Sequence, residues 1–81
     1  MFCYHFYYVI KQANIELLKF GDKLRKYRLS QSISQEQLAF EAGLTREYIN
    51  KIENGKVNIS LKNIIAISKV LDIPPKDLLD F

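Results

Sequence analysis

The chain has 81 residues, of which 48% are hydrophobic, and it carries a formal net charge of +3 at pH 7. A chain of this length forms one domain with a modest core, for which helices with local contacts are an economical solution. The basic balance is compatible with a nucleic-acid partner, but many basic proteins bind none.

The reactive side chains exclude several classes of protein. Cys3 is the single cysteine, which excludes an intramolecular disulfide and a zinc site of several cysteines, and a lone thiol fits the cytoplasm. His5 has only Cys3 as a neighbouring metal ligand, and two ligands do not make a site. The sequence contains no serine–histidine–acid set, glycine-rich phosphate loop or paired carboxylates in an apolar pocket. We therefore expect no enzymatic activity, no cofactor and no metal.

Residues 1–19 are expected to form an N-terminal arm or an extra helix. Five of the first ten residues, MFCYHFYYVI, are aromatic, a composition that favours strand over helix. The run is too short for a membrane span and lacks the features of a secretory signal. Because such an apolar patch does not stay exposed on a soluble monomer, we expect it to pack on the domain or to form a dimer.

A helix is predicted from about Ile15 to Leu29, with Gly21 as a candidate break. Phe20, Leu24 and Tyr27 recur at helical spacing, so they are predicted to face the core.

The next predicted helix covers Gln35–Ala42. Ser34 and Gln37 have the spacing of a capping box at its start. Gly43 follows its last residue, where a left-handed backbone suits glycine. A tight turn is therefore predicted directly after this helix.

A second short helix, Arg46–Glu53, follows that turn. Thr45 can cap its first turn, and Asn54-Gly55 ends it. Ile49 and Ile52 are three residues apart and are predicted to face inward. Two short helices with this turn are typical of a helix-turn-helix, which places its second helix in the DNA major groove.

The C-terminal third is predicted to contain two more helices. Ser60 caps a helix over Leu61–Leu71 that is apolar on more than half its surface, which predicts a central place in the core. Pro74-Pro75 then separates it from a short helix over 76–79.

The segment from Phe20 to Phe81 resembles the phage-repressor or Xre family of helix-turn-helix proteins, which includes lambda repressor and Cro. The resemblance rests on Gln35, Leu38, Ala39, Gly43, Thr45, Ile49, Ile52, Glu53, Asn54 and Gly55. It implies an all-α, compact five-helix lambda-repressor-like domain over 20–81, with the helix-turn-helix at 34–55 and the aromatic extension before it. The strings Thr45–Ile49 and Asn58–Leu61 are also similar to controller proteins of restriction-modification systems.

A recognition helix presents its N-terminal residues to base edges. The expected base-reading residues are Thr45, Arg46, Glu47, Asn50 and Lys51, of which the resemblance supports Arg46, Glu47 and Lys51. Arg46 can bind guanine through two parallel hydrogen bonds, and Glu47 can accept from cytosine or orient Arg46. The alternative is that these are only solvated helix residues.

The expected phosphate contacts lie around both ends of the motif. They are Gln35, Tyr48, Asn54 and Lys56. Tyr48 has an equal alternative, which is packing against the preceding helix.

The resemblance also implies a structural ion pair between Arg28 and Glu53, largely buried. It favours a dimer surface formed by Ile73, Leu78, Leu79 and Phe81, for which the aromatic arm is a rival or a supplement. The alternative is that Leu78 and Phe81 close the core of the monomer.

The sequence therefore predicts a cytoplasmic, sequence-specific regulator of transcription that binds double-stranded DNA as a homodimer on an inverted repeat. It would block RNA polymerase at a promoter or recruit it by contact, and a controller protein would do both at different sites. The competing hypothesis is an antitoxin or adaptor that uses the same fold for protein binding, with residues 1–19 as its partner-binding segment.

Overall fold

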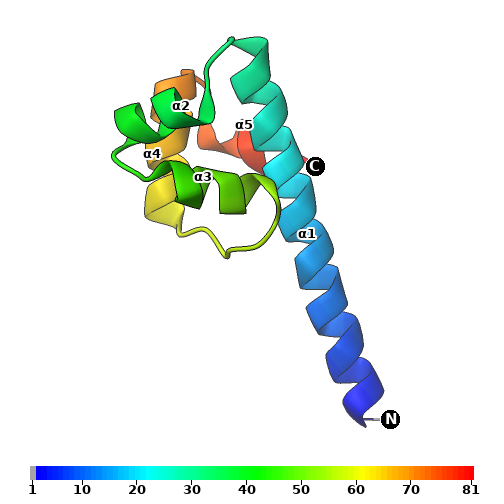
Figure 1. Ribbon diagram of the computed structural model, residues 1–81. Coiled ribbons are helices and arrows are strands. Elements are labelled where there is room, and N and C mark those ends of the chain that lie inside the picture. The colour runs from blue at the N-terminus through cyan, green and yellow to red at the C-terminus, as the bar shows by residue number, and fades with distance from the viewer. Residues whose placement is uncertain (1) are drawn as a thin grey trace.

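The computed structural model describes residues 2–81, with side chains described from Asn14 onward. Residues 2–81 form five helices and contain no strand (Figure 1). Their bounds are α1 Phe2–Ser30, α2 Gln35–Ala42, α3 Arg46–Glu53, α4 Leu61–Leu71 and α5 Pro75–Leu79. The four shorter helices gather beside the C-terminal half of α1 (Figure 1). The all-α, five-helix prediction is confirmed.

Helix α1 differs from its prediction at two points. It begins at Phe2 rather than near Ile15, so the expectation of strand for the aromatic run is wrong. It also continues through Gly21, which is buried against α3. The side chains of residues 1–13, including Cys3 and His5, lie outside the described residues, and so do the contacts predicted for them.

The ends of the shorter helices follow the predicted caps. The side chains of Ser34, Thr45 and Ser60 each accept a hydrogen bond from a backbone N–H in the first turn of α2, α3 and α4. These bonds satisfy donors that a helix start otherwise leaves free. Local signals thus account for the observed bounds of α2, α3 and α4, which match the predicted ones.

All five helices contribute side chains to the core. Its buried side chains are Phe20, Leu24, Leu38, Ala39, Ile49, Ile52, Ile64, Ile67, Leu71 and Leu78. The prediction for α4 is only partly right. Ile64, Ile67 and Leu71 are buried, but Leu61 is 66% exposed and Ile65 is 36% exposed. One apolar face of α4 therefore enters the core, and another remains on the surface.

The assignment of Leu78 to a dimer surface is wrong. Its side chain is fully buried in the monomer core, because α5 turns that face toward α1 and α4. Ile73 is half-buried against the same core. Leu79 and Phe81 are about half exposed, at 48% and 49%, so the core alternative does not account for Phe81.

The outer face of α1 is solvated and carries a small charge cluster. Hydrogen bonds from Lys26 and Arg25 hold the pKa of the Asp22 carboxyl below its ordinary value. In the part of the chain that the structure describes, none of the helices combines the length and the apolar character that crossing a bilayer requires.

Candidate nucleic-acid interface

The turn between α2 and α3 fixes the angle of the two helices. Gly43 adopts a left-handed backbone with φ of 72°, and the N–H of Leu44 donates to the carbonyl of Ala39 at 2.8 Å. This is the way in which a glycine ends a helix and satisfies its last carbonyls. Thr45 then begins α3, accepting from the N–H of Tyr48 at 3.1 Å. These bonds set the path of the chain between the two helices, which also pack directly against each other.

Helix α3 has a buried face and an exposed face. Ile49, Ile52 and Glu53 are buried, whereas the predicted base-reading residues are all exposed. Those residues are Thr45, Arg46, Glu47, Asn50 and Lys51. All five side chains are therefore accessible to a ligand that approaches α3 from the solvent.

The buried end of α3 is fixed by an ion pair. Arg28 Nε donates to Glu53 Oε2 at 2.6 Å, and Arg28 Nη2 donates to Glu53 Oε1 at 3.1 Å. Their side chains are 10% and 2% exposed. Arg28 Nη1 also donates to the carbonyl of Ile33, in the loop before α2. This parallel pair of bonds ties α1 to α3 and to the start of α2.

Gln35 lies beside this pair. Its Nε2 donates to Glu53 Oε1 at 3.1 Å, and its Oε1 is 3.5 Å from Asn50 Nδ2. Asn54 Nδ2 in turn donates to the carbonyl oxygen of Asn50 at 2.8 Å. Gln35, Asn50 and Asn54 thus form one polar row across the start of α2 and the end of α3. The sequence placed these residues in the interface but gave no sign of their mutual bonds.

Tyr48 contacts α4 through its hydroxyl. Its hydroxyl accepts a hydrogen bond from Asn63 Nδ2 at 3.0 Å, and its side chain is half-buried. Asn63 was absent from the predicted site, because no local motif connects positions fifteen residues apart. A hydroxyl that accepts this bond still has its own proton to donate, so a phosphate contact from Tyr48 remains compatible with the geometry.

The helix-turn-helix carries exposed charges at both ends of α3. Lys56 follows α3 and is exposed, and Lys51 is exposed on its last turn. Glu47 is exposed in the first turn, where it would repel a phosphate unless it has a base or Arg46 as its partner. The described residues contain no group of three metal-binding side chains.

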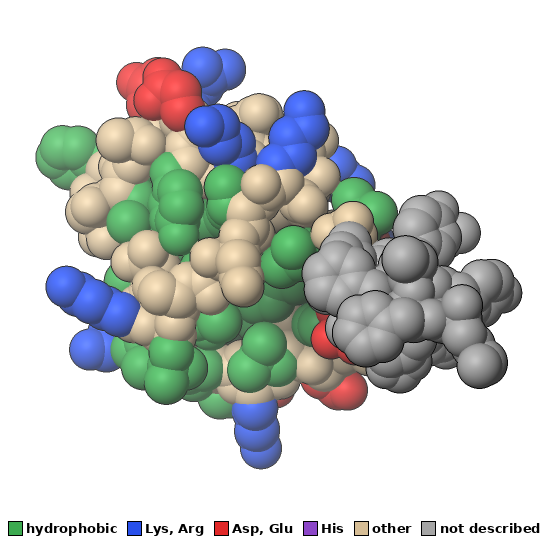
Figure 2. All heavy atoms as spheres, turned by 90° about the horizontal axis from the view of Figure 1, so that it is seen from below, with side chains coloured by type: hydrophobic (Ala, Val, Ile, Leu, Met, Phe, Trp, Pro, Cys, Tyr) green, Lys and Arg blue, Asp and Glu red, His purple; other side chains and the backbone are tan. Residues whose placement is uncertain are grey.

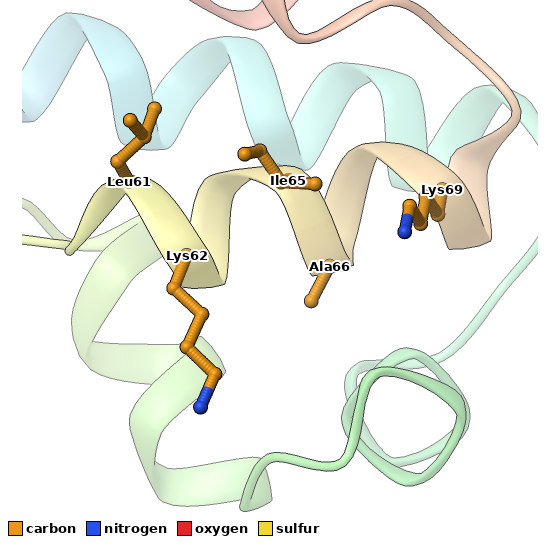
Figure 3. A pocket seen from close by; sticks show the side chains of 5 residues that line it. All are labelled: Leu61, Lys62, Ile65, Ala66 and Lys69. Carbon is orange, nitrogen blue, oxygen red and sulfur yellow. The ribbon is translucent and has the colours of Figure 1, made fainter.

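A second exposed feature is apolar. Figure 2 shows hydrophobic side chains gathered across the middle of one face, with Lys and Arg side chains at its margins. On α4 a shallow groove of about 540 Å³ is lined by Leu61, Lys62, Ile65, Ala66 and Lys69. Leu61 and Ile65 project from one side of the helix, and Lys62 and Ala66 from the other (Figure 3).

The chain is similar in sequence to known helix-turn-helix proteins. Residues 24–78 match the family described as helix-turn-helix. The chain is 61% identical over 69 residues to control protein C.BamHI of Bacillus amyloliquefaciens, covering 84% of each chain. It is 44% identical over 62 residues to control protein C.MunI of a Mycoplasma species, covering 75% of this chain and 84% of that one.

A solved structure gives the same result. The restriction-modification controller protein C.AhdI of Aeromonas hydrophila superposes with a TM-score of 0.78 and 45% sequence identity. The match covers 79% of this chain and 97% of that protein. The family match over residues 24–78 includes α2, α3 and the turn between them.

Proposed function

This chain belongs to the helix-turn-helix family, and from that premise we propose that it is a sequence-specific transcriptional regulator that binds double-stranded DNA. The family is one of DNA-binding regulators and not of enzymes. The observation that carries the proposal is the exposed side of α3, where Arg46, Asn50 and Lys51 stand on a helix whose other side is buried in the core.

Base reading is assigned to the outer face of α3. Arg46 matches the O6 and N7 acceptors of guanine, and such a pair discriminates by about 1–3 kcal/mol. Glu47 accepts from cytosine or orients Arg46, and Thr45, Asn50 and Lys51 complete the set. Phosphate contacts from Gln35, Tyr48, Asn54 and Lys56 would fix the position of α3 on the duplex without carrying sequence information.

We further propose that the regulator acts as a homodimer. A single recognition helix covers few base pairs, whereas two helices about 34 Å apart read successive turns on one face of an inverted repeat. The C-terminal segment of one copy, with exposed Leu79 and Phe81 beside Asp80, complements the groove on α4 of the other. That groove is apolar at Leu61 and Ile65 and has Lys62 and Lys69 at its margin.

The subtype that we propose is a controller protein of a restriction-modification system. The support is the 61% and 44% identity to two control proteins and the 45% identity to a third. Bound at a promoter, the dimer would exclude RNA polymerase from an overlapping site and recruit it by contact from an adjacent one.

Selection from a pool of random duplexes tests this function. Purified protein is incubated with the pool at two salt concentrations, and the retained duplexes are sequenced. We expect an inverted repeat whose half-sites lie one helical turn apart, enriched at both salt concentrations. Retention that is independent of sequence and lost at modest salt would reduce the activity to phosphate attraction and contradict the proposal.

A further inference from the structure

Glu53 determines how the side-chain amides of the polar row, Gln35, Asn50 and Asn54, are oriented. A carboxylate held by Arg28 only accepts hydrogen bonds, so the NH₂ group of Gln35 must be the side of the amide that faces Glu53. The carbonyl side of Gln35 then faces away from the core. The buried charge therefore fixes which end of this amide faces Glu53 and leaves its oxygen for Asn50, on the exposed part of α3.

The orientation of the Gln35 amide also affects Asn50, which is exposed on α3. The side-chain oxygen of Gln35, Oε1, accepts from Asn50 Nδ2 at 3.5 Å. The side-chain oxygen of Asn50, Oδ1, accepts from Asn54 Nδ2 at 3.3 Å. Both partners of Asn50 thus favour one orientation of its amide. Asn50 is exposed on the base-reading face, whereas Gln35 is half-buried and Glu53 is buried.

We propose that Gln35 is a positioning residue for base reading, held by the carboxylate of Glu53 and fixing the side chain of Asn50. This rests on the proposed function, and it extends the phosphate contact predicted for Gln35 from the sequence. Preorganised side chains lose less freedom when they bind, so the row sharpens the base preference of Asn50. The Arg28–Glu53 pair thereby serves recognition as well as stability.

The two roles of Gln35 predict different behaviour. A residue that only touches phosphate changes the affinity for every sequence by the same factor, whereas a residue that orients a base-reading amide changes preference at one base position. A loss of fold stability moves the melting temperature and leaves that preference unchanged. Because 3.5 Å is long for a hydrogen bond, the step from Gln35 to Asn50 is the one that the experiment addresses.

The experiment uses the full chain and the duplex that the wild type selects, with every single-base variant of that duplex. Affinities are measured for Gln35→Met, Asn50→Ala and the double variant. Gln37→Met is the matched control, since Gln37 is an exposed glutamine on α2 whose side chain bonds only to Glu41 among the described residues. Melting temperatures are recorded for all four.

We expect Gln35→Met to lower discrimination roughly tenfold at the base position that Asn50→Ala affects. The double variant should lose no more than the larger single loss, and Gln37→Met should match the wild type. Gln35→Glu is a second test that keeps the side-chain length. Repulsion from Glu53 should turn the new carboxylate away, so that it no longer holds the Asn50 amide. Its loss of discrimination at that base position should equal that of Gln35→Met, whatever the added charge does to the overall affinity.

A uniform fall in affinity across all duplexes would overturn the positioning role and leave Gln35 as a phosphate contact. Additive losses at different base positions would overturn it as well. Failure of the underlying function has a separate signature, because the wild type would then show no preferred duplex at all.

Discussion

Gly21 and Ile52 approach so closely that a Cβ on Gly21 would lie 2.3 Å from the carbonyl oxygen of Ile52. The same Cβ would lie 2.6 Å from the carbonyl oxygen of Glu53. Both atoms belong to the backbone at the end of α3, which cannot move aside as a side chain can. The helix that carries Arg28 is therefore pressed against the recognition helix at a point where only glycine fits.

Substitution of Gly21 by Ala should destabilise the protein. Alanine in a helix normally gains about 0.5–1 kcal/mol over glycine, but overpacking costs about 1–3 kcal/mol, so the net change is a loss. Urea unfolding followed by circular dichroism measures it. Lys19→Ala, at an exposed position on α1, should leave stability nearly unchanged. A Gly21→Ala protein as stable as the wild type would show that α1 and α3 are not in close contact.

Removing one charge of the Arg28–Glu53 pair should lower the free energy of unfolding substantially. Glu53→Gln leaves the guanidinium buried without its counter-charge, and such losses are typically about 3–5 kcal/mol. Replacing both residues by apolar ones, as in Arg28→Met with Glu53→Leu, should recover much of that stability. Equal melting temperatures for the wild type and Glu53→Gln would assign the pair no structural role.

Tyr48 and Asn63 should act as one unit in stability. Tyr48→Phe removes the hydroxyl that accepts from Asn63, and we expect a loss of about 0.5–1.5 kcal/mol. Asn63→Ala should cost a similar amount, and the double variant should cost little more than either single variant. Full additivity in the unfolding free energies would mean that the two side chains are independent.

How much of this could be predicted from the sequence depends on how local each signal is. The starts of α2, α3 and α4 follow from Ser34, Thr45 and Ser60, because a cap acts within three residues. The roles of Gly21 and Asn63 depend on elements that the fold brings from elsewhere in the chain, and nothing near them in the sequence indicates it.

Two further features show the same limit. Leu78 and Leu79 are adjacent and chemically identical, yet one is buried and the other half exposed. A five-residue helix is too short for its periodicity to decide which one faces inward. The base-reading roles of the exposed α3 residues are predictions from the sequence and remain so. The role of the bond between Gln35 and Glu53 in base reading is likewise a proposal.

The proposed dimer surface predicts a change in assembly. Replacing Leu79 and Phe81 together by Asp should weaken dimerisation at least tenfold, because charges replace the apolar contact to α4 of the second copy. Sedimentation equilibrium measures the dissociation constant. Phe40→Asp is the control, since Phe40 is 81% exposed but lies on α2. If Phe40→Asp dissociates the dimer and the C-terminal variant does not, the surface lies elsewhere.

Arg46, in the first turn of α3, shows whether this helix reads base sequence. The measurement is the affinity of wild type and Arg46→Ala for the selected duplex and for each of its single-base variants. We expect Arg46→Ala to lose about 1–3 kcal/mol of discrimination at one position of each half-site and to keep its preferences elsewhere. An equal loss on every duplex, with all base preferences intact, would make Arg46 a phosphate contact and contradict the account.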